Sequence, residues 1–176
     1  MYRRSVGWVL VVAVALGVTG LSVSPVRATV SGQTCGGRTP TIETTGGGTV
    51  LGTGGRDVII ALGGATVYGG AGGDFICVDG FATVYGGAGD DVIRGDGPDG
   101  FHLRPCASYA YGGSGDDVIF CALYQFGGSG SDSLEVGWEL RGESGGDTLY
   151  FGETVCDGGS GKDAVTGLCP VTKNVP

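Results

Sequence analysis

A nine-residue pattern of glycine and aspartate recurs seven times in this chain and sets the strongest limit on its fold. Each copy begins with glycine, has aspartate at its sixth position and has an aliphatic residue at its eighth. The copies are GTGGRDVII from Gly52, GGAGGDFIC from Gly69, GGAGDDVIR from Gly86, GGSGDDVIF from Gly112, GGSGSDSLE from Gly127, GESGGDTLY from Gly142 and GGSGKDAVT from Gly158. Successive copies start 17, 17, 26, 15, 15 and 16 residues apart. One copy plus a shorter connecting segment is therefore the unit, which is about one turn of a coil.

The regular spacing of the repeats indicates a folded rather than a disordered chain. Forty glycines and six prolines make up about a quarter of the 176 residues, a share at which chains without a period are usually disordered. The length is that of one domain. Charged residues amount to only 16% and the net charge is -8, which argues against a nucleic-acid partner, because such proteins carry basic patches.

The motif has a stereochemical explanation. Glycines at positions one, two and four allow positive φ angles and a close approach of backbone carbonyl groups. After the aspartate, three residues alternate like a strand, so the aliphatic residue at the eighth position points inward. The expected inward row is Ile59, Ile76, Ile93, Ile119, Leu134, Leu149 and Val165, and the opposing row contains Val67, Val84, Ala110 and Leu140. Gln125 also falls in the opposing row, and because an inward position would bury its amide, a register shift in that turn is an open alternative.

Stacked turns place the aspartates in one column. Strands repeat at about 4.8 Å, and two carboxylates at that distance repel by roughly 0.9 kcal/mol at a dielectric constant near 80, or about 3.5 kcal/mol near 20. A divalent cation between turns would reverse this repulsion, and carboxylate and carbonyl oxygens are the ligands that calcium prefers. The candidate metal site comprises Asp57, Asp74, Asp91, Asp117, Asp132, Asp147 and Asp163 with the first glycines Gly52, Gly69, Gly86, Gly112, Gly127, Gly142 and Gly158. Seven stacked loops have six spaces between them, so up to six Ca²⁺ ions are expected.

The seven copies resemble the GGxGxD nonapeptides of the RTX (repeats-in-toxin, hemolysin-type) family of calcium-binding proteins over residues 52–166. The resemblance implies an all-β, single-domain parallel β-helix of about seven turns, with calcium bound between stacked loops and ion binding coupled to folding. Family members typically carry nonapeptides on both sides of the coil, whereas segments such as ALGGATVY lack the aspartate here. We therefore expect one calcium-binding side and one plain side. A metal-free solenoid with ordinary Gly-Asp turns is the alternative.

The N-terminal residues 1–28 have the pattern of a signal peptide. Arg3 and Arg4 precede an apolar stretch, and Val26 and Ala28 suit signal-peptidase cleavage. An uncleaved membrane anchor is the alternative. Cleavage leaves 7 of the 10 basic residues against all 18 acidic ones, a net charge of -11. The resulting expectation is a secreted protein without a stable membrane span, with an N-terminal cap at 29–51, the repeats at 52–166 and a tail at 167–176.

Six cysteines in an exported chain predict disulfides. Proximity in the sequence favours Cys106–Cys121 and Cys156–Cys169, which leaves Cys35 to bond to Cys77. Zinc is the weaker alternative, because the chain has one histidine and no C-x-x-C pair.

Several residues lie outside the column. Asp90 and Asp116 each precede a column aspartate and either add metal ligands or are solvated turn residues. The insertion from Gly95 to Tyr111 carries Asp96, Asp99 and His102 and is either a partner or ion site or a tolerated surface loop. Aromatic residues precede four of the glycine starts and should form an outer ladder: Tyr68, Tyr85, Tyr111 and Phe126.

No catalytic motif is visible in the sequence. His102 has no evident nucleophile nearby and there is no G-x-S-x-G segment, so we expect no enzyme. A calcium-stiffened surface adhesin that binds a glycan or a protein through the aromatic ladder is the main alternative function. An extracellular enzyme acting on polysaccharide is a more remote one.

Overall fold

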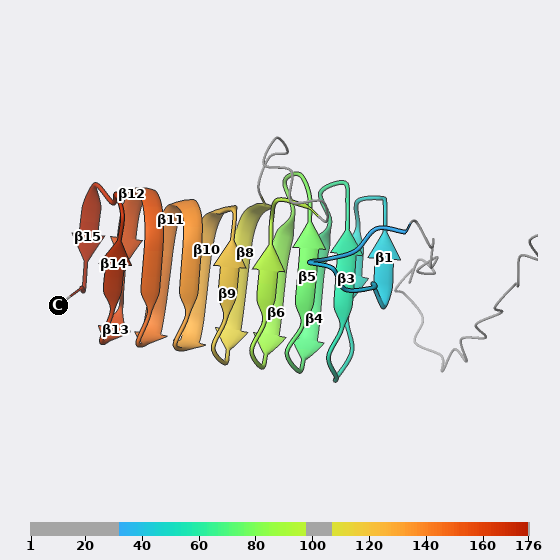
Figure 1. Cartoon of the computed structure of the whole chain (residues 1–176), viewed down its shortest axis with the longest axis horizontal. Helices are drawn as coiled ribbons and strands as arrows, with labels where there is room; N and C mark the ends of the chain where they lie inside the picture. Colours follow the sequence, from blue (N-terminus) through green and yellow to red (C-terminus); the bar gives the residue numbers. More distant parts are fainter. Residues whose placement is uncertain (1–31, 98–106, 176) are drawn as a thin grey trace, which may run out of the picture.

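The computed structural model describes residues 32–97 and 107–175. They form a parallel β-helix of about eight turns, and no helix occurs in these ranges. The turns follow one another along a single axis, with β1 near the N-terminal end and β15 at the C-terminal end (Figure 1). The predicted fold class is confirmed, with one turn more than the seven expected from the repeats.

Strand length varies from 2 residues in β13 to 13 residues in β11. Their bounds are β1 Ile42–Thr44, β2 Thr49–Leu51, β3 Val58–Ala61, β4 Thr66–Ala71, β5 Phe75–Val78, β6 Thr83–Ala88, β7 Val92–Arg94, β8 Ala107–Ser114, β9 Val118–Phe120, β10 Ala122–Gly130, β11 Ser133–Gly145, β12 Thr148–Asp157, β13 Ser160–Gly161, β14 Ala164–Thr166 and β15 Val171–Lys173. Every strand pair is parallel, as the coil requires.

Two sheet faces enclose the core. One face contains β1, β3, β5, β7 and β9, and the other contains β2, β4, β6, β8 and β10, with the long strands β11 and β12 contributing to both. The Gly-Asp loops connect the second face to the first, for example from β4 to β5, and lie along the lower rim in Figure 1. The upper rim carries the plain turns, so the aspartate column lies on one side of the coil only.

The core consists of two rows of side chains that face each other across the coil. The repeat-derived row runs in register from Ile42 through Ile59, Ile76, Ile93, Ile119, Leu134 and Leu149 to Val165. The opposing row runs from Val50 through Val67, Val84, Ala110, Gln125 and Leu140 to Cys156. Most of these side chains are fully buried, which confirms the two predicted rows.

Gln125 keeps the register of its row, and the register shift considered for its turn does not occur. It pairs with Ala110 on one side and Leu140 on the other and is completely buried. Its Nε2 donates to the carbonyl oxygens of Ala122, Glu135 and Val136 at 2.9–3.1 Å. These carbonyl groups belong to the plain turns, so the amide satisfies backbone acceptors where the chain bends tightly.

Replacing Gln125 with leucine is expected to lower the free energy of unfolding by about 1–3 kcal/mol, because three backbone carbonyl groups of the plain turns lose a donor. Denaturant unfolding would measure this change. Ala110→Val in the neighbouring turn is the control, since it alters volume at the same row without removing a donor. A leucine variant more stable than the parent would contradict the assignment of Gln125 as a donor to the turns.

The coil extends beyond the repeats at both ends. Residues 29–51 include β1 and β2, which pair with β3 and β4 and form a complete first turn. The 167–176 segment includes β15, which pairs with β12. The eighth turn therefore comes from the expected N-terminal cap, which the sequence suggested as a first partial turn and which forms a complete one.

Disulfides are present near both ends of the coil. Cys35 bonds to Cys77 and Cys156 bonds to Cys169, which confirms two of the predicted pairs. Cys121 is also disulfide-bonded, but Cys106 lies outside the described residues, as do residues 1–28. Such bonds are typical of extracellular proteins.

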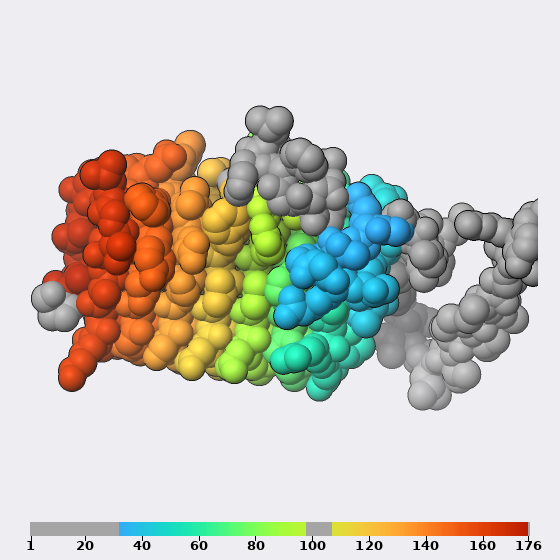
Figure 2. All heavy atoms as spheres, in the orientation of Figure 1, coloured from blue at the N-terminus to red at the C-terminus, as the bar shows by residue number. Residues whose placement is uncertain are grey.

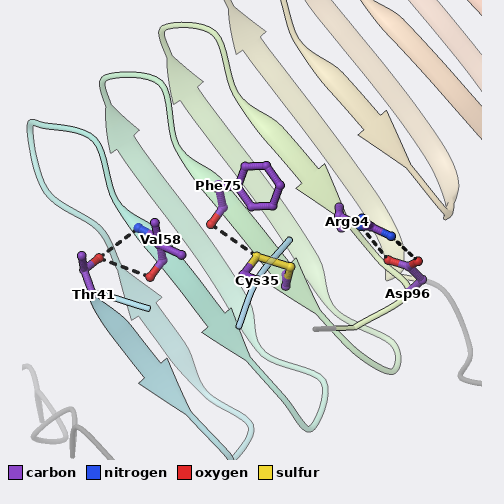
Figure 3. Close-up of a disulfide and its surroundings, with 7 residues drawn as sticks. Cys35, Thr41, Val58, Phe75, Arg94 and Asp96 are labelled. Carbon is purple, nitrogen blue, oxygen red and sulfur yellow. Dashed lines mark hydrogen bonds and ion pairs between the residues drawn. A yellow bond between two sulfur atoms is a disulfide. The ribbon is translucent and has the colours of Figure 1, made fainter. Parts of the chain in front are cut away.

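The segment that carries Cys35 lies across the outer face of the first turns. Figure 2 shows it over β3 and β5, and Figure 3 shows the disulfide beside Phe75. Under this segment, Ile60 and Cys77 are completely buried although they point out of the coil. Arg38 lies over the Phe75 ring at 4.2 Å from its centroid. The N-terminal segment thus covers an apolar patch and is fixed by one covalent bond.

The start of the long insertion is held by an ion pair. Arg94 contacts Asp96 through two hydrogen bonds of 2.8 and 3.2 Å, and Asp96 is fully buried (Figure 3). Asp96 is therefore paired with Arg94 at the start of the insertion, and whether the insertion is an ion or partner site or a tolerated surface loop stays a prediction. Asp99 and His102 lie outside the described residues. Within the ranges that are described, no segment forms a helix suited to crossing a membrane.

Candidate metal centre

The seven repeat aspartates lie in one column on the glycine-loop side of the coil. Each follows its loop directly and precedes the inward strand residue by two positions, so the repeat period brings all seven into register. All are buried, with exposed fractions between 0% for Asp91 and Asp117 and 7% for Asp163. Seven carboxyl groups in a buried column are unusual, since buried charges normally have partners.

In six of the seven aspartates, one carboxylate oxygen accepts a hydrogen bond from the backbone of the preceding turn. The N–H of each column aspartate donates to Oδ1 of the aspartate in the next turn, at 2.7–3.0 Å, across all six gaps from Asp57 to Asp163. This ladder links neighbouring turns in place of a strand hydrogen bond. It explains why the sixth position is aspartate, because the carboxylate must reach back to the N–H of the preceding aspartate in the column.

The second oxygen has no such partner in six of the seven residues. The Oδ2 atoms of Asp74, Asp91, Asp117, Asp132, Asp147 and Asp163 are buried and accept no hydrogen bond. A buried acceptor without a donor is destabilising by about 1–3 kcal/mol, and more if it is charged. The column therefore requires either a cation or protons at these oxygens.

Asp57 is the exception and serves as an internal control. Its Oδ2 accepts hydrogen bonds from the backbone N–H and the hydroxyl of Thr53 at 2.7 and 2.8 Å, and its Oδ1 accepts one from Thr41. Thr53 stands where most other repeats have a second glycine. The first aspartate is thus satisfied by protein groups, whereas the other six are not.

The first glycine of each repeat leaves space against this second oxygen. A Cβ added at Gly69 or Gly158 would lie 2.6 Å from the Oδ2 of its own aspartate, and added Cβ atoms at Gly86, Gly112, Gly127 and Gly142 would come closer still. At Gly112 the same Cβ would lie 2.5 Å from the carbonyl oxygen of Gly127 in the next turn. The Cβ position of the first glycine therefore lies close to both a carboxylate oxygen and a carbonyl oxygen of the following turn, so a residue with a Cβ does not fit there.

The ionised form of the column is unfavourable, because its carboxylates are buried and lie close to one another. Burial raises the pKa of Asp117 to about 7 and that of Asp91 and Asp132 to about 6, in each case with a contribution from the neighbouring aspartates of the column. Burial likewise raises the pKa of Asp74 and Asp147. The hydrogen bond from the adjacent backbone N–H acts in the opposite direction but is the smaller effect. The central carboxylates are thus the most destabilised in their charged form.

The donor set fits calcium only if backbone oxygens take part. Among the described residues, no group of three or more His, Cys, Asp or Glu side chains is close enough to hold a metal ion. Calcium accepts six to eight oxygens that include backbone carbonyl groups, whereas magnesium demands a stricter octahedron and retains its water. The unpaired Oδ2 atoms and the glycine cradles therefore suit Ca²⁺ held by column aspartates together with loop carbonyl oxygens.

Asp90 and Asp116 are exposed and lie outside the column. The N–H of Asp116 donates to Oδ1 of Asp90 at 3.0 Å, and the N–H of Ser131 donates to Oδ1 of Asp116 at 2.7 Å. They form a short second ladder on the loop surface. The interpretation as solvated turn residues fits this geometry better than the interpretation as ligands of the buried column.

The predicted aromatic ladder is confirmed and is wider than expected. Tyr68, Tyr85, Tyr111 and Phe126 stack in order with ring centroids 4.7–4.9 Å apart and nearly parallel planes. Tyr109 and Tyr124 form a second stack beside it, with centroids 5.0 Å apart. Arg141 ends the main row, with its guanidinium 6.0 Å from the Phe126 centroid. The second stack was not predicted from the sequence, although Tyr109 and Tyr124 each precede an aromatic residue of the main row by two positions.

No protein-family model, curated protein or solved structure matches this chain.

Proposed function

We propose that this protein is an exported calcium-binding repeat protein in which ions bound between the Gly-Asp loops couple calcium binding to folding. The observation that carries the proposal is the row of six buried Oδ2 atoms without a donor. A cation at these oxygens would neutralise the column and link adjacent turns. The resemblance of the repeats to the RTX family supports the same function.

The proposed location follows from the disulfides and the N-terminal pattern. The structure contains disulfides at both ends of the coil, which are typical of extracellular proteins. In such compartments calcium is abundant, and sites with dissociation constants of roughly 10⁻⁴–10⁻³ M are sufficient. The chain would cross the membrane unfolded and complete its coil where calcium is present.

Equilibrium dialysis against calcium tests the proposal directly. The expected result is saturable binding of up to six ions per chain, one for each gap between loops, with weaker binding of magnesium. No bound calcium at millimolar concentration would contradict the proposal. In that case the column would be a metal-free structural ladder.

An Asp117→Asn variant separates the charge from the hydrogen bond. Asparagine keeps an oxygen for the Asp91 N–H and removes the central charge, so the metal-free protein is expected to gain about 1–3 kcal/mol of stability at neutral pH. Bound calcium should fall by about two ions, because Asp117 borders two gaps. Dialysis and denaturant unfolding measure these effects.

Asp90→Asn is the matched control, since Asp90 is an exposed aspartate of the same loop region. It should leave the number of bound ions unchanged and alter the stability much less than Asp117→Asn, because the Asp90 charge is only a minor cause of the raised pKa values of Asp91 and Asp117. Equal losses of calcium in both variants would mean that surface charge, rather than the buried column, holds the ions.

A surface interaction module is the second candidate function. The observation that favours it is the exposed aromatic row, in which Tyr68 is 43% and Tyr109 is 40% exposed. Both faces of Tyr85 and Tyr111 are occupied by neighbouring rings, so a sugar cannot stack on the inner rings as it does on an isolated aromatic residue. Tyr68→Ser with Tyr85→Ser would abolish binding to a glycan or protein target while the calcium response remains.

A further inference from the structure

The outer aromatic face contains a set of phenol rings held one above another. Tyr68, Tyr85 and Tyr111 are spaced 4.9 Å apart with interplanar angles of 6°, and Tyr109 and Tyr124 are spaced 5.0 Å apart at 14°. Tyr109 and Tyr111 connect the two stacks at 6.5 Å. Five tyrosines therefore lie on one face with each ring next to another phenol.

We propose that this face is an oxidative modification site, at which adjacent turns of the coil are cross-linked through dityrosine by a peroxidase and hydrogen peroxide. The pairs are Tyr68–Tyr85, Tyr85–Tyr111 and Tyr109–Tyr124. This proposal concerns the outer sheet face and does not depend on calcium at the aspartate column.

The reaction balances with hydrogen peroxide as the oxidant. Each of two phenols loses one electron and its hydroxyl proton and becomes a tyrosyl radical. The radicals join through a carbon–carbon bond between ring positions next to the hydroxyl groups, and the hydrogens on these two carbons move to the phenol oxygens. The peroxide accepts the two electrons and two protons and becomes two molecules of water.

The fold favours coupling within one chain. Neighbouring rings are separated by the distance between adjacent strands. Equivalent ring carbons of neighbouring phenols are therefore about 5 Å apart without any movement of the backbone. Groups held this close react as if at very high concentration, whereas separate chains meet only by diffusion. The exposure of Tyr68 at 43% and of Tyr85 at 36% gives an oxidant access and leaves room for the rings to turn.

The position of these links complements the disulfides. Disulfides Cys35–Cys77 and Cys156–Cys169 hold the first and last parts of the coil, and Cys121 between β9 and β10 is also disulfide-bonded. The tyrosine pairs add direct links between strands β4, β6, β8 and β10 of one sheet face. A carbon–carbon link is not broken by reductants. Oxidation of this face would therefore fix the central turns under conditions that open the disulfides.

Treatment of the purified protein with a peroxidase and hydrogen peroxide tests the proposal. The expected product is a monomer that shows dityrosine fluorescence, has lost two hydrogens per link and yields cross-linked peptides of the named pairs. Monomeric dityrosine should form several-fold more in the folded protein than in protein unfolded by denaturant. Dityrosine found only in dimers and larger species, or in equal amounts in the unfolded protein, would overturn the proposal.

Two conservative variants locate the reaction. Tyr85→Phe keeps a stacked ring but removes the phenol shared by two pairs, so links to Tyr68 should disappear while Tyr109–Tyr124 remains. Tyr150→Phe is the control, because Tyr150 lies in the row of the opposite sheet face with Glu135 and should take no part. Persistence of Tyr68 in intramolecular cross-links in the Tyr85→Phe protein would show that ladder proximity does not select the pairs.

Discussion

Alanine at Gly112 is expected to lower the free energy of unfolding by at least about 3 kcal/mol and to remove calcium binding at that loop. The added Cβ would overlap Asp117 Oδ2 and lie 2.5 Å from the carbonyl oxygen of Gly127, and all of these groups are in the packed interior of the column. Neither neighbour is the end of a flexible side chain on the surface. The backbone of two turns would therefore have to separate.

Gly54→Ala is the matched control for this variant. Gly54 belongs to the first repeat, has no positive φ, and has no atom within 4 Å of an added Cβ. Its replacement should change stability by less than about 1 kcal/mol. Denaturant unfolding and equilibrium dialysis of both proteins provide the comparison. Equal losses at the two positions would mean that the effect at Gly112 does not come from the crowding around Asp117.

Acidification is expected to stabilise the calcium-free protein. The pKa of Asp117 is raised to about 7 and those of Asp91 and Asp132 to about 6, from 3.8 in the unfolded chain. The folded state therefore binds more protons than the unfolded state between pH 7 and 4. The stabilisation is fully present below about pH 4 and is lost as the pH rises through 6 and 7.

Denaturant unfolding in a chelator across pH 4 to 8 measures this dependence. The free energy of unfolding should fall as the pH rises, and Asp117→Asn should flatten the curve. With calcium present the trend should weaken or reverse, because protons and calcium compete for the same oxygens. A calcium-free protein that loses stability on acidification from pH 7 to 5 would show that the column does not govern its pH response.

The repeat period was sufficient to predict the coil and the position of its aspartates. The eighth-position aliphatic residues and the aspartates share one spacing, so stacking either set also aligns the other. The same argument predicted the row of Tyr68, Tyr85, Tyr111 and Phe126. Spacing along the chain determines which residues become neighbours when every turn repeats one strand geometry.

Contacts that depend on the path of the backbone at the turns were not predictable in this way. Gln125 looked unsuited to an apolar row because the carbonyl groups of the tight plain turns, which it satisfies, are not visible in the sequence. The pairing of Arg94 with Asp96 depends on the local bend after β7. The hydrogen bond from each aspartate N–H to Oδ1 of the aspartate in the next turn depends on how adjacent turns are offset in space, which the sequence does not show.

One available signal in the sequence was overlooked. Thr53 replaces the second glycine only in the first repeat and supplies two donors to Asp57. A residue that departs from the repeat pattern at the end of a column is a candidate donor to the terminal carboxylate of that column. The other departure at this position, Glu143, has a φ of 75°, a conformation that favours glycine.

Far-UV circular dichroism at neutral pH tests calcium-coupled folding most directly. The protein, with its disulfides intact, is first treated with chelator and then titrated with calcium, with magnesium titrated in parallel. The account predicts a metal-free protein with reduced β signal that calcium restores and magnesium restores poorly. A fully folded metal-free protein whose spectrum and stability do not respond to calcium would contradict it and would leave a coil held by its disulfides and its aspartate ladder.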